Sequence, residues 1–134
     1  MYKIVKCLKF LHNKNVIHRD IKPENILLSQ DKNVLKLCDF GFARFIPENL
    51  KEMTDYVATR WYRSPELLVG EPYHKPSDIF ALGCIIGELV DGQPMFPGED
   101  EIDQLHLLRK AIGELTEQQE NYMEQNPKFA NVHL

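Results

Sequence analysis

The sequence lacks the features of several broad protein classes. Its three cysteines, Cys7, Cys38 and Cys84, are widely separated and odd in number, so they form neither a disulfide framework nor a Cys-x-x-Cys zinc site. We expect reduced, buried thiols. The longest apolar run, Ile79 to Gly87, is too short to span a bilayer, and the segment after Met1 lacks the apolar core of a signal peptide.

An excess of positive charge is also missing. The 134 residues carry a formal net charge of -4, which gives no electrostatic reason to expect nucleic acid or a membrane as partner. The hydrophobic fraction of 43% and the charged fraction of 27% are those of an ordinary globular protein. We expect one domain at most, located inside the cell in the cytoplasm and/or the nucleus, where thiols stay reduced.

Chemically active side chains are concentrated in one stretch, Val16 to Asn25, which reads Val-Ile-His-Arg-Asp-Ile-Lys-Pro-Glu-Asn. It holds Asp20, Lys22 and Asn25, and a second carboxylate follows at Asp39. A carboxylate can orient a hydroxyl and accept its proton, an amide oxygen and another carboxylate can hold Mg²⁺, and a lysine can neutralise phosphate charge. The combination predicts phosphoryl transfer.

Two short apolar runs, Ile26 to Leu28 and Val34 to Leu37, flank a polar turn and predict a β-hairpin. Antiparallel pairing would return Asp39 to the end of the ladder where Asn25 lies. Taken alone, Asp39 could be a turn carboxylate before Gly41, but the presence of Asp20, Lys22 and Asn25 favours a metal ligand.

A lone histidine such as His18 is more often a core residue bonded to backbone than a base or a metal ligand.

Three motifs occur in order: Asp20 to Asn25, Asp39-Phe40-Gly41, and Ser64-Pro65-Glu66. Together they resemble the C-terminal lobe of a eukaryotic protein kinase, nearest to the proline-directed CMGC superfamily of cyclin-dependent-kinase-like and mitogen-activated kinases. The resemblance covers almost the whole chain. It implies an α+β, mainly helical fold in which a short hairpin bears the catalytic and Mg²⁺-binding residues.

The resemblance also implies roles for single residues. Asp20 would be the base that orients a protein hydroxyl, and Lys22, which steadies the transferring phosphate, favours serine or threonine substrates over tyrosine. Asn25 and Asp39 would bind Mg²⁺ with ATP. Thr59 would hydrogen-bond near Asp20 and Lys22.

Residues 39–66 would be the activation segment of such a kinase. Thr54-Asp55-Tyr56 matches its Thr-x-Tyr pattern, so Thr54 and Tyr56 are candidates for regulatory phosphorylation by an upstream kinase, although both could simply be polar loop residues. Arg19 would pair with the added phosphate. Arg63 would shape the pocket for the substrate residue after the acceptor, with a preference for proline.

Helical patterns account for most of the remaining chain. Apolar spacing predicts a helix over Met1 to Asn13 and another over about 100–112, and Pro65 opens a short helix. Ser77 and Asp78 are expected to cap a central helix over about 77–90 that is apolar on nearly all sides and buried. By resemblance, Asp78 braces the catalytic-loop backbone and His18 packs beneath Phe40.

The kinase pattern is incomplete, because no Gly-x-Gly-x-x-Gly loop and no Val-Ala-Ile-Lys strand occur. Residues 1–134 are therefore expected to form a partial kinase domain without its N-terminal lobe, inactive alone, marginally stable and with exposed apolar surface. One alternative is a catalytically inactive, truncated fragment that acts as an interaction module. Another is a small-molecule phosphotransferase, against which the peptide-docking pattern of residues 54–66 argues.

Overall fold

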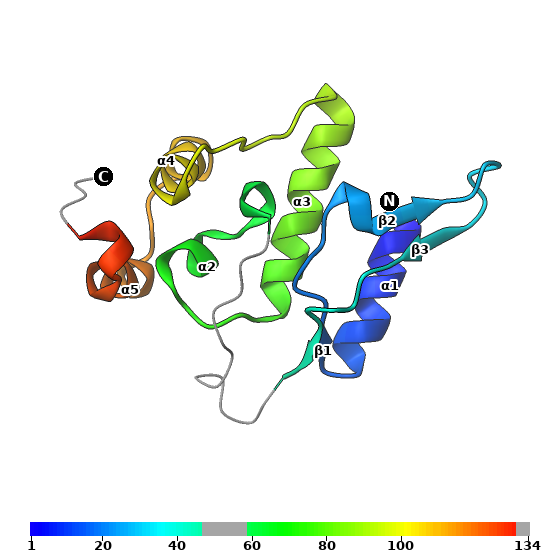
Figure 1. The fold of residues 1–134 in the computed structure, drawn as a ribbon, viewed down its shortest axis with the longest axis horizontal. Helices are drawn as coiled ribbons and strands as arrows, with labels where there is room; N and C mark the ends of the chain where they lie inside the picture. The colour runs from blue at the N-terminus through cyan, green and yellow to red at the C-terminus, as the bar shows by residue number, and fades with distance from the viewer. Residues whose placement is uncertain (47–58, 131–134) are drawn as a thin grey trace.

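The computed structural model describes residues 1–46 and 59–130 and shows a mainly helical α+β fold, as predicted. The elements, in chain order, are α1 (Tyr2–Asn13), β1 (Val16–Ile17), η1 (Pro23–Asn25), β2 (Ile26–Leu28), β3 (Leu35–Leu37), β4 (Arg44–Phe45), η3 (Arg60–Tyr62), α2 (Pro65–Val69), α3 (Lys75–Asp91), α4 (Glu101–Ile112), α5 (Glu117–Gln125) and η4 (Pro127–Phe129). Helix α3 lies in the middle, with α1 and the hairpin on one side and α2, α4 and α5 on the other (Figure 1).

The β2–β3 hairpin is formed as the sequence predicts. Its strands are antiparallel, with Ile26 opposite Leu37 and Leu28 opposite Leu35. The Cys38 amide donates to the Asn25 carbonyl at 2.9 Å, which continues the ladder by one residue pair. The chain segments that carry Asn25 and Asp39 therefore leave the hairpin at the same end.

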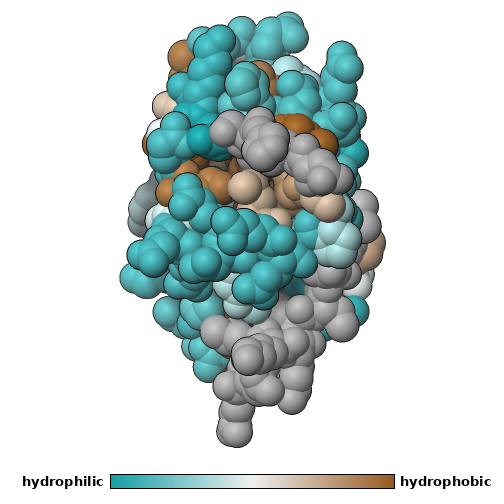
Figure 2. Space-filling view, turned by 90° about the vertical axis from the view of Figure 1, so that its left-hand side faces the viewer, coloured by the Kyte–Doolittle hydropathy of each residue, from teal (hydrophilic) through white to brown (hydrophobic). Residues whose placement is uncertain are grey.

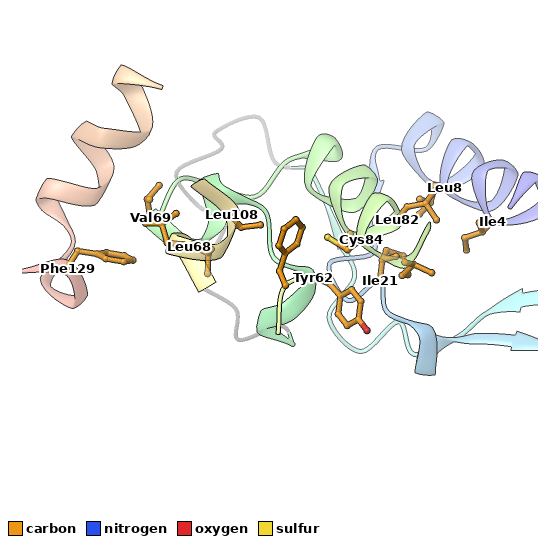
Figure 3. Packing of buried hydrophobic residues seen from close by; sticks show 14 residues of the cluster. Ile4, Leu8, Ile21, Tyr62, Leu68, Val69, Leu82, Cys84, Leu108 and Phe129 are labelled. Carbon is orange, nitrogen blue, oxygen red and sulfur yellow. The ribbon is translucent and has the colours of Figure 1, made fainter. Parts of the chain in front are cut away.

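The hydrophobic core runs along the length of the molecule. Figure 3 shows side chains from Phe129 at one end to Ile4 at the other, with Tyr62 and Cys84 between them. Because each helix contributes one apolar face to this core, a single cluster connects the N-terminal and C-terminal parts of the described chain. The face that carries α4 and α5 is mostly hydrophilic, with hydrophobic side chains gathered in a band across it (Figure 2).

Helix α3 begins earlier than the sequence suggested. It starts at Lys75 after the N-cap residue His74, whose Nδ1 accepts from the Lys75 amide at 2.9 Å. Pro76 is compatible with a first turn because the missing amide has no partner there. The expectation that Ser77 and Asp78 form the N-cap is thus wrong, and both side chains are buried instead.

The expectation that α3 is a buried helix is wrong for one face. Leu89 is 71% exposed and Val90 is 79% exposed, and Ile79 and Ile86 are also exposed. The opposite face, with Leu82 and its neighbours, lies in the core. The expected exposed apolar surface is therefore present, and it follows one stripe of this helix.

Replacing Leu89 by Lys together with Val90 by Glu should reduce self-association of the chain, because both side chains lie in the exposed stripe. The free energy of unfolding should change by less than about 0.5 kcal/mol. Sedimentation velocity and urea unfolding measure the two quantities. As a control, Leu82→Ala should cost about 2–5 kcal/mol of stability without reducing self-association. Equal self-association in the double variant and the parent would contradict the prediction.

Helix α5 (Glu117–Gln125) was not predicted, because the chain from Gln118 onward is polar and only weakly patterned. The signal was a capping box: the Thr116 hydroxyl accepts from the Gln119 amide at 3.2 Å, and the Gln119 side chain accepts from the Thr116 amide at 3.0 Å. After α5, the Asn126 side-chain amide donates to the Val69 carbonyl at 3.1 Å. This bond attaches the C-terminal part to the end of α2.

The cysteines are all free, and only Cys84 is fully buried, whereas Cys7 and Cys38 are half-buried. The expectation of three buried thiols is therefore wrong for two of them. Burial raises the pKa of the Cys84 thiol to about 12, which keeps it protonated. Within the described ranges, no helix is both long and apolar enough to cross a membrane.

Iodoacetamide at pH 8 should therefore modify Cys7 and Cys38 and spare Cys84 in the folded chain. The reason is that alkylation requires a thiolate within reach of solvent. Peptide mass spectrometry after timed labelling measures this, and labelling in urea provides the control in which all three react. Equal labelling of Cys84 without denaturant would contradict the burial.

Candidate active site

The predicted catalytic loop, residues 16–25, holds several polar side chains that are buried. His18 is 0% exposed, and Arg19, Asp20 and Asn25 are 4%, 4% and 6% exposed. Burying such groups is costly unless each is hydrogen-bonded or paired. The loop therefore depends on partners supplied by other elements.

Asp78 on α3 is the main partner of this loop. Its carboxylate accepts from the amides of His18 and Arg19, each at 3.0 Å, and it lies 2.8 Å from Nε2 of His12. The predicted bracing of the loop backbone is confirmed. His12 could not be predicted as a partner, since a histidine in the last turn of a helix gives no local sign of a contact 66 residues away.

The backbone at Arg19 explains why this support matters. Its φ of 73° lies in the left-handed region, which costs a non-glycine residue about 1–2 kcal/mol. The Asp78 carboxylate accepts from the two consecutive amides of His18 and Arg19. It thereby stabilises a conformation that the local sequence does not favour.

His18 has the structural role that was expected. Its Nδ1 accepts from the Asp20 amide at 3.2 Å, so Nε2 carries the proton and donates to the Cys38 carbonyl at 3.0 Å. Its ring meets the Phe40 ring edge-on, with 4.9 Å between centroids. The imidazole thus connects the catalytic loop to the Asp39-Phe40-Gly41 segment.

Four of the candidate residues form one chain of polar contacts. Asn25 Nδ2 donates to the backbone carbonyl of Asp20 at 2.8 Å and to the carboxylate Oδ2 of Asp20 at 3.1 Å. Lys22 Nζ lies 3.5 Å from the same Oδ2 and donates to Thr59 Oγ1 at 3.1 Å. Among the residues that the structure describes, the side-chain contacts of the Asp20 carboxylate fall on Oδ2, so Oδ1 can face another partner, as a base facing a hydroxyl requires.

The donor set at Asn25 and Asp39 suits Mg²⁺. Because Nδ2 of Asn25 donates to Asp20, its Oδ1 is turned to the other side of the amide group. Asp39 is exposed, and its Oδ1 accepts from the Gly41 amide at 3.3 Å. One amide oxygen and one carboxylate are hard oxygen ligands, which Mg²⁺ takes together with phosphate oxygens. No group of three or more His, Cys, Asp or Glu side chains arranged for a metal occurs in the described ranges.

Asp39 also has a left-handed backbone, with φ of 57°. Aspartate tolerates this region better than most residues. A Cβ at Gly41 would come 3.2 Å from Asp39 Oδ1, so the glycine leaves room for the carboxylate. Asp39 thus combines a strained backbone conformation with a side chain that needs a glycine two residues later.

Arg19 and Arg63 lie beside Asp20, and together with Thr59 and Tyr73 they line one small cavity. The Arg19 guanidinium lies over the Tyr73 ring at 5.5 Å, and Arg63 NH1 is 3.6 Å from Glu101 Oε1. Burial raises the pKa of the Tyr73 hydroxyl. Thr54 and Tyr56 lie outside the described residues, so their phosphorylation and its recognition by Arg19 stay predictions.

Asp20, Lys22 and Asn25 meet in one loop, and Asp39 follows the hairpin that starts after Asn25, which is the arrangement expected of a protein-kinase fold. The family model for the protein kinase domain matches residues 1–132, and the chain belongs to this family. The resemblance proposed from the three motifs is confirmed.

Curated relatives place the chain near the cyclin-dependent-kinase-like proteins. It is 55% identical to mouse cyclin-dependent kinase-like 5 over 135 residues, which is 100% of this chain and 14% of that protein. It is 53% identical to rat cyclin-dependent kinase-like 2, over 100% of this chain and 26% of the rat protein. It is 50% identical to human cyclin-dependent kinase-like 2, over 100% of this chain and 27% of the human protein. The chain thus spans about a seventh to a quarter of these relatives.

Replacing Asp78 by Asn should lower the free energy of unfolding by about 1–3 kcal/mol, because the amide can accept fewer of the bonds from the buried loop amides. Chemical unfolding measures the loss. Asp91→Asn, an exposed change on the same helix, is the matched control and should be neutral. Equal stability of the two variants would show that Asp78 does not support the loop.

Proposed function

We propose that this chain is the substrate-binding and Mg²⁺-binding part of a serine/threonine protein kinase that transfers the γ-phosphoryl group of ATP to protein hydroxyls. The observation that carries this proposal is the connected set of Asp20, Lys22, Asn25 and Thr59, in which the described contacts hold one oxygen of the Asp20 carboxylate. The other oxygen would face the substrate hydroxyl. Family membership supports the same reaction.

In this mechanism Asp20 orients the substrate hydroxyl and accepts its proton. The hydroxyl oxygen then bonds to the γ-phosphorus, the bond from that phosphorus to the bridging oxygen of ATP breaks, and ADP leaves. Lys22 neutralises charge on the transferring group. The oxygens of Asn25 and Asp39 would hold Mg²⁺, which supplies charge neutralisation for the phosphates.

The finer features of the proposal concern substrates and control. The substrates would be proteins whose acceptor serine or threonine is followed by proline, a residue that Arg63 would help to recognise. An upstream kinase would phosphorylate Thr54 and Tyr56, and Arg19 would pair with the phosphate on Thr54. The protein would act in the cytoplasm and/or the nucleus. Similarity to cyclin-dependent-kinase-like proteins supports protein substrates as a class.

A chimera tests the catalytic proposal. Residues 1–134 replace the 135 aligned residues of human cyclin-dependent kinase-like 2, and transfer of labelled phosphate from ATP to a Ser-Pro peptide is measured. We expect turnover, with Asp20→Asn lowering kcat by about 10²–10⁴-fold because the base is lost. Asp91→Asn is the control with normal turnover.

A folded chimera without turnover, next to an active parent protein, would refute the proposal. The 134-residue chain alone should transfer no phosphate, because its sequence contains no glycine-rich loop and no strand lysine for the ATP phosphates. Turnover by the chain alone would show that these elements are not needed.

A further inference from the structure

The turn η3 is attached to the segment that precedes α4. Trp61 Nε1 donates to the Gly98 carbonyl at 3.1 Å, and Arg60 NH1 donates to the Glu99 carbonyl at 2.7 Å. Two successive side chains of η3 therefore bind two successive carbonyls of the other segment. Thr59, which receives the bond from Lys22, comes directly before this turn.

Glu101 adds charge to the same contact. Its Oε2 lies 3.8 Å from Arg60 NH2, and its Oε1 lies 3.6 Å from Arg63 NH1. One carboxylate thus faces the arginines at both ends of the Arg60–Arg63 stretch. Arg63 is only 8% exposed, so water stabilises its charge less than the charge of a surface arginine. Nearby polar and acidic groups must therefore stabilise this charge.

The segment on which η3 rests is itself held firmly. The Gly98 amide donates to Gln104 Oε1 at 3.0 Å, and Gln104 is 0% exposed. A Cβ at position 98 would come within 2.5–2.8 Å of Gln104 atoms, one of them backbone. Asp100 caps α4 by accepting from the amides of Ile102 and Asp103. Glu101 therefore projects from a fixed helix start, not from a flexible loop.

We propose that Glu101 is a positioning residue for the protein substrate. By holding Arg60 and Arg63 against the start of α4, it keeps Thr59 within reach of Lys22 beside Asp20. The catalytic consequence rests on the proposed function, whereas the attachment of η3 through Glu101 does not. Loss of Glu101 should raise KM for the peptide substrate and leave KM for ATP unchanged, since no described contact of Glu101 involves Asn25 or Asp39.

The first test reports on the attachment itself. Trp61 is the single tryptophan of the chain, so its indole N–H gives one unambiguous NMR signal. In Glu101→Gln we expect solvent exchange of that proton to speed up about three- to tenfold, because the turn is less firmly held. Glu99→Gln removes the same charge from an exposed neighbouring side chain and should leave the exchange rate unchanged. Unchanged exchange in Glu101→Gln would overturn the proposal.

The second test uses the chimera described above. Glu101→Gln should raise KM for the Ser-Pro peptide about three- to tenfold while kcat and KM for ATP stay within about twofold. Glu101→Asp, which keeps the charge, should recover part of the loss, and Glu99→Gln should behave as the parent.

The possible failures are distinguishable. Faster indole exchange with an unchanged peptide KM would overturn the positioning role and leave the proposed function intact. If the parent chimera is inactive, the failure belongs to the proposed function, and the indole exchange then decides alone whether Glu101 holds the turn.

Discussion

The site depends on one buried carboxylate, Asp78. It satisfies two amides of a loop whose backbone would otherwise carry unpaired donors, and it does so from the rigid central helix α3. The left-handed conformation at Arg19 is held by those bonds. Without them the loop could relax, and Asp20 would lose its place relative to Lys22 and Asn25. The chemistry of the site is thus set by a residue that touches none of the reacting groups.

The features that sequence analysis predicted correctly are those with a local signal. The hairpin follows from two apolar runs around a polar turn, and α1 and α4 follow from apolar spacing. The start of α3 was misplaced because Ser77 and Asp78 have the residue types of an N-cap. Pro76 was not recognised as part of the first turn, where proline is tolerated. Helix α5 was missed although its capping box was readable.

The parts of the site that could not be predicted depend on contacts between distant residues. Asp20, Lys22, Asn25 and Asp39 were identified by their order along the chain, but nothing local indicates that His12 meets Asp78 or that Glu101 meets Arg60 and Arg63. Such pairs form only after the helices have packed. Motifs therefore identify which groups carry the chemistry, and the three-dimensional structure identifies which groups hold them in place.

The hairpin between Asn25 and Asp39 has a further consequence for engineering. Its polar turn around Asp31 is exposed and lies at the opposite end of the ladder from both residues. Extra residues placed there would lengthen only the tip, and the entropic penalty of a longer loop grows slowly with its length. This tip is therefore a permissive place for a short tag or a spectroscopic label, well separated from the groups that would meet the nucleotide.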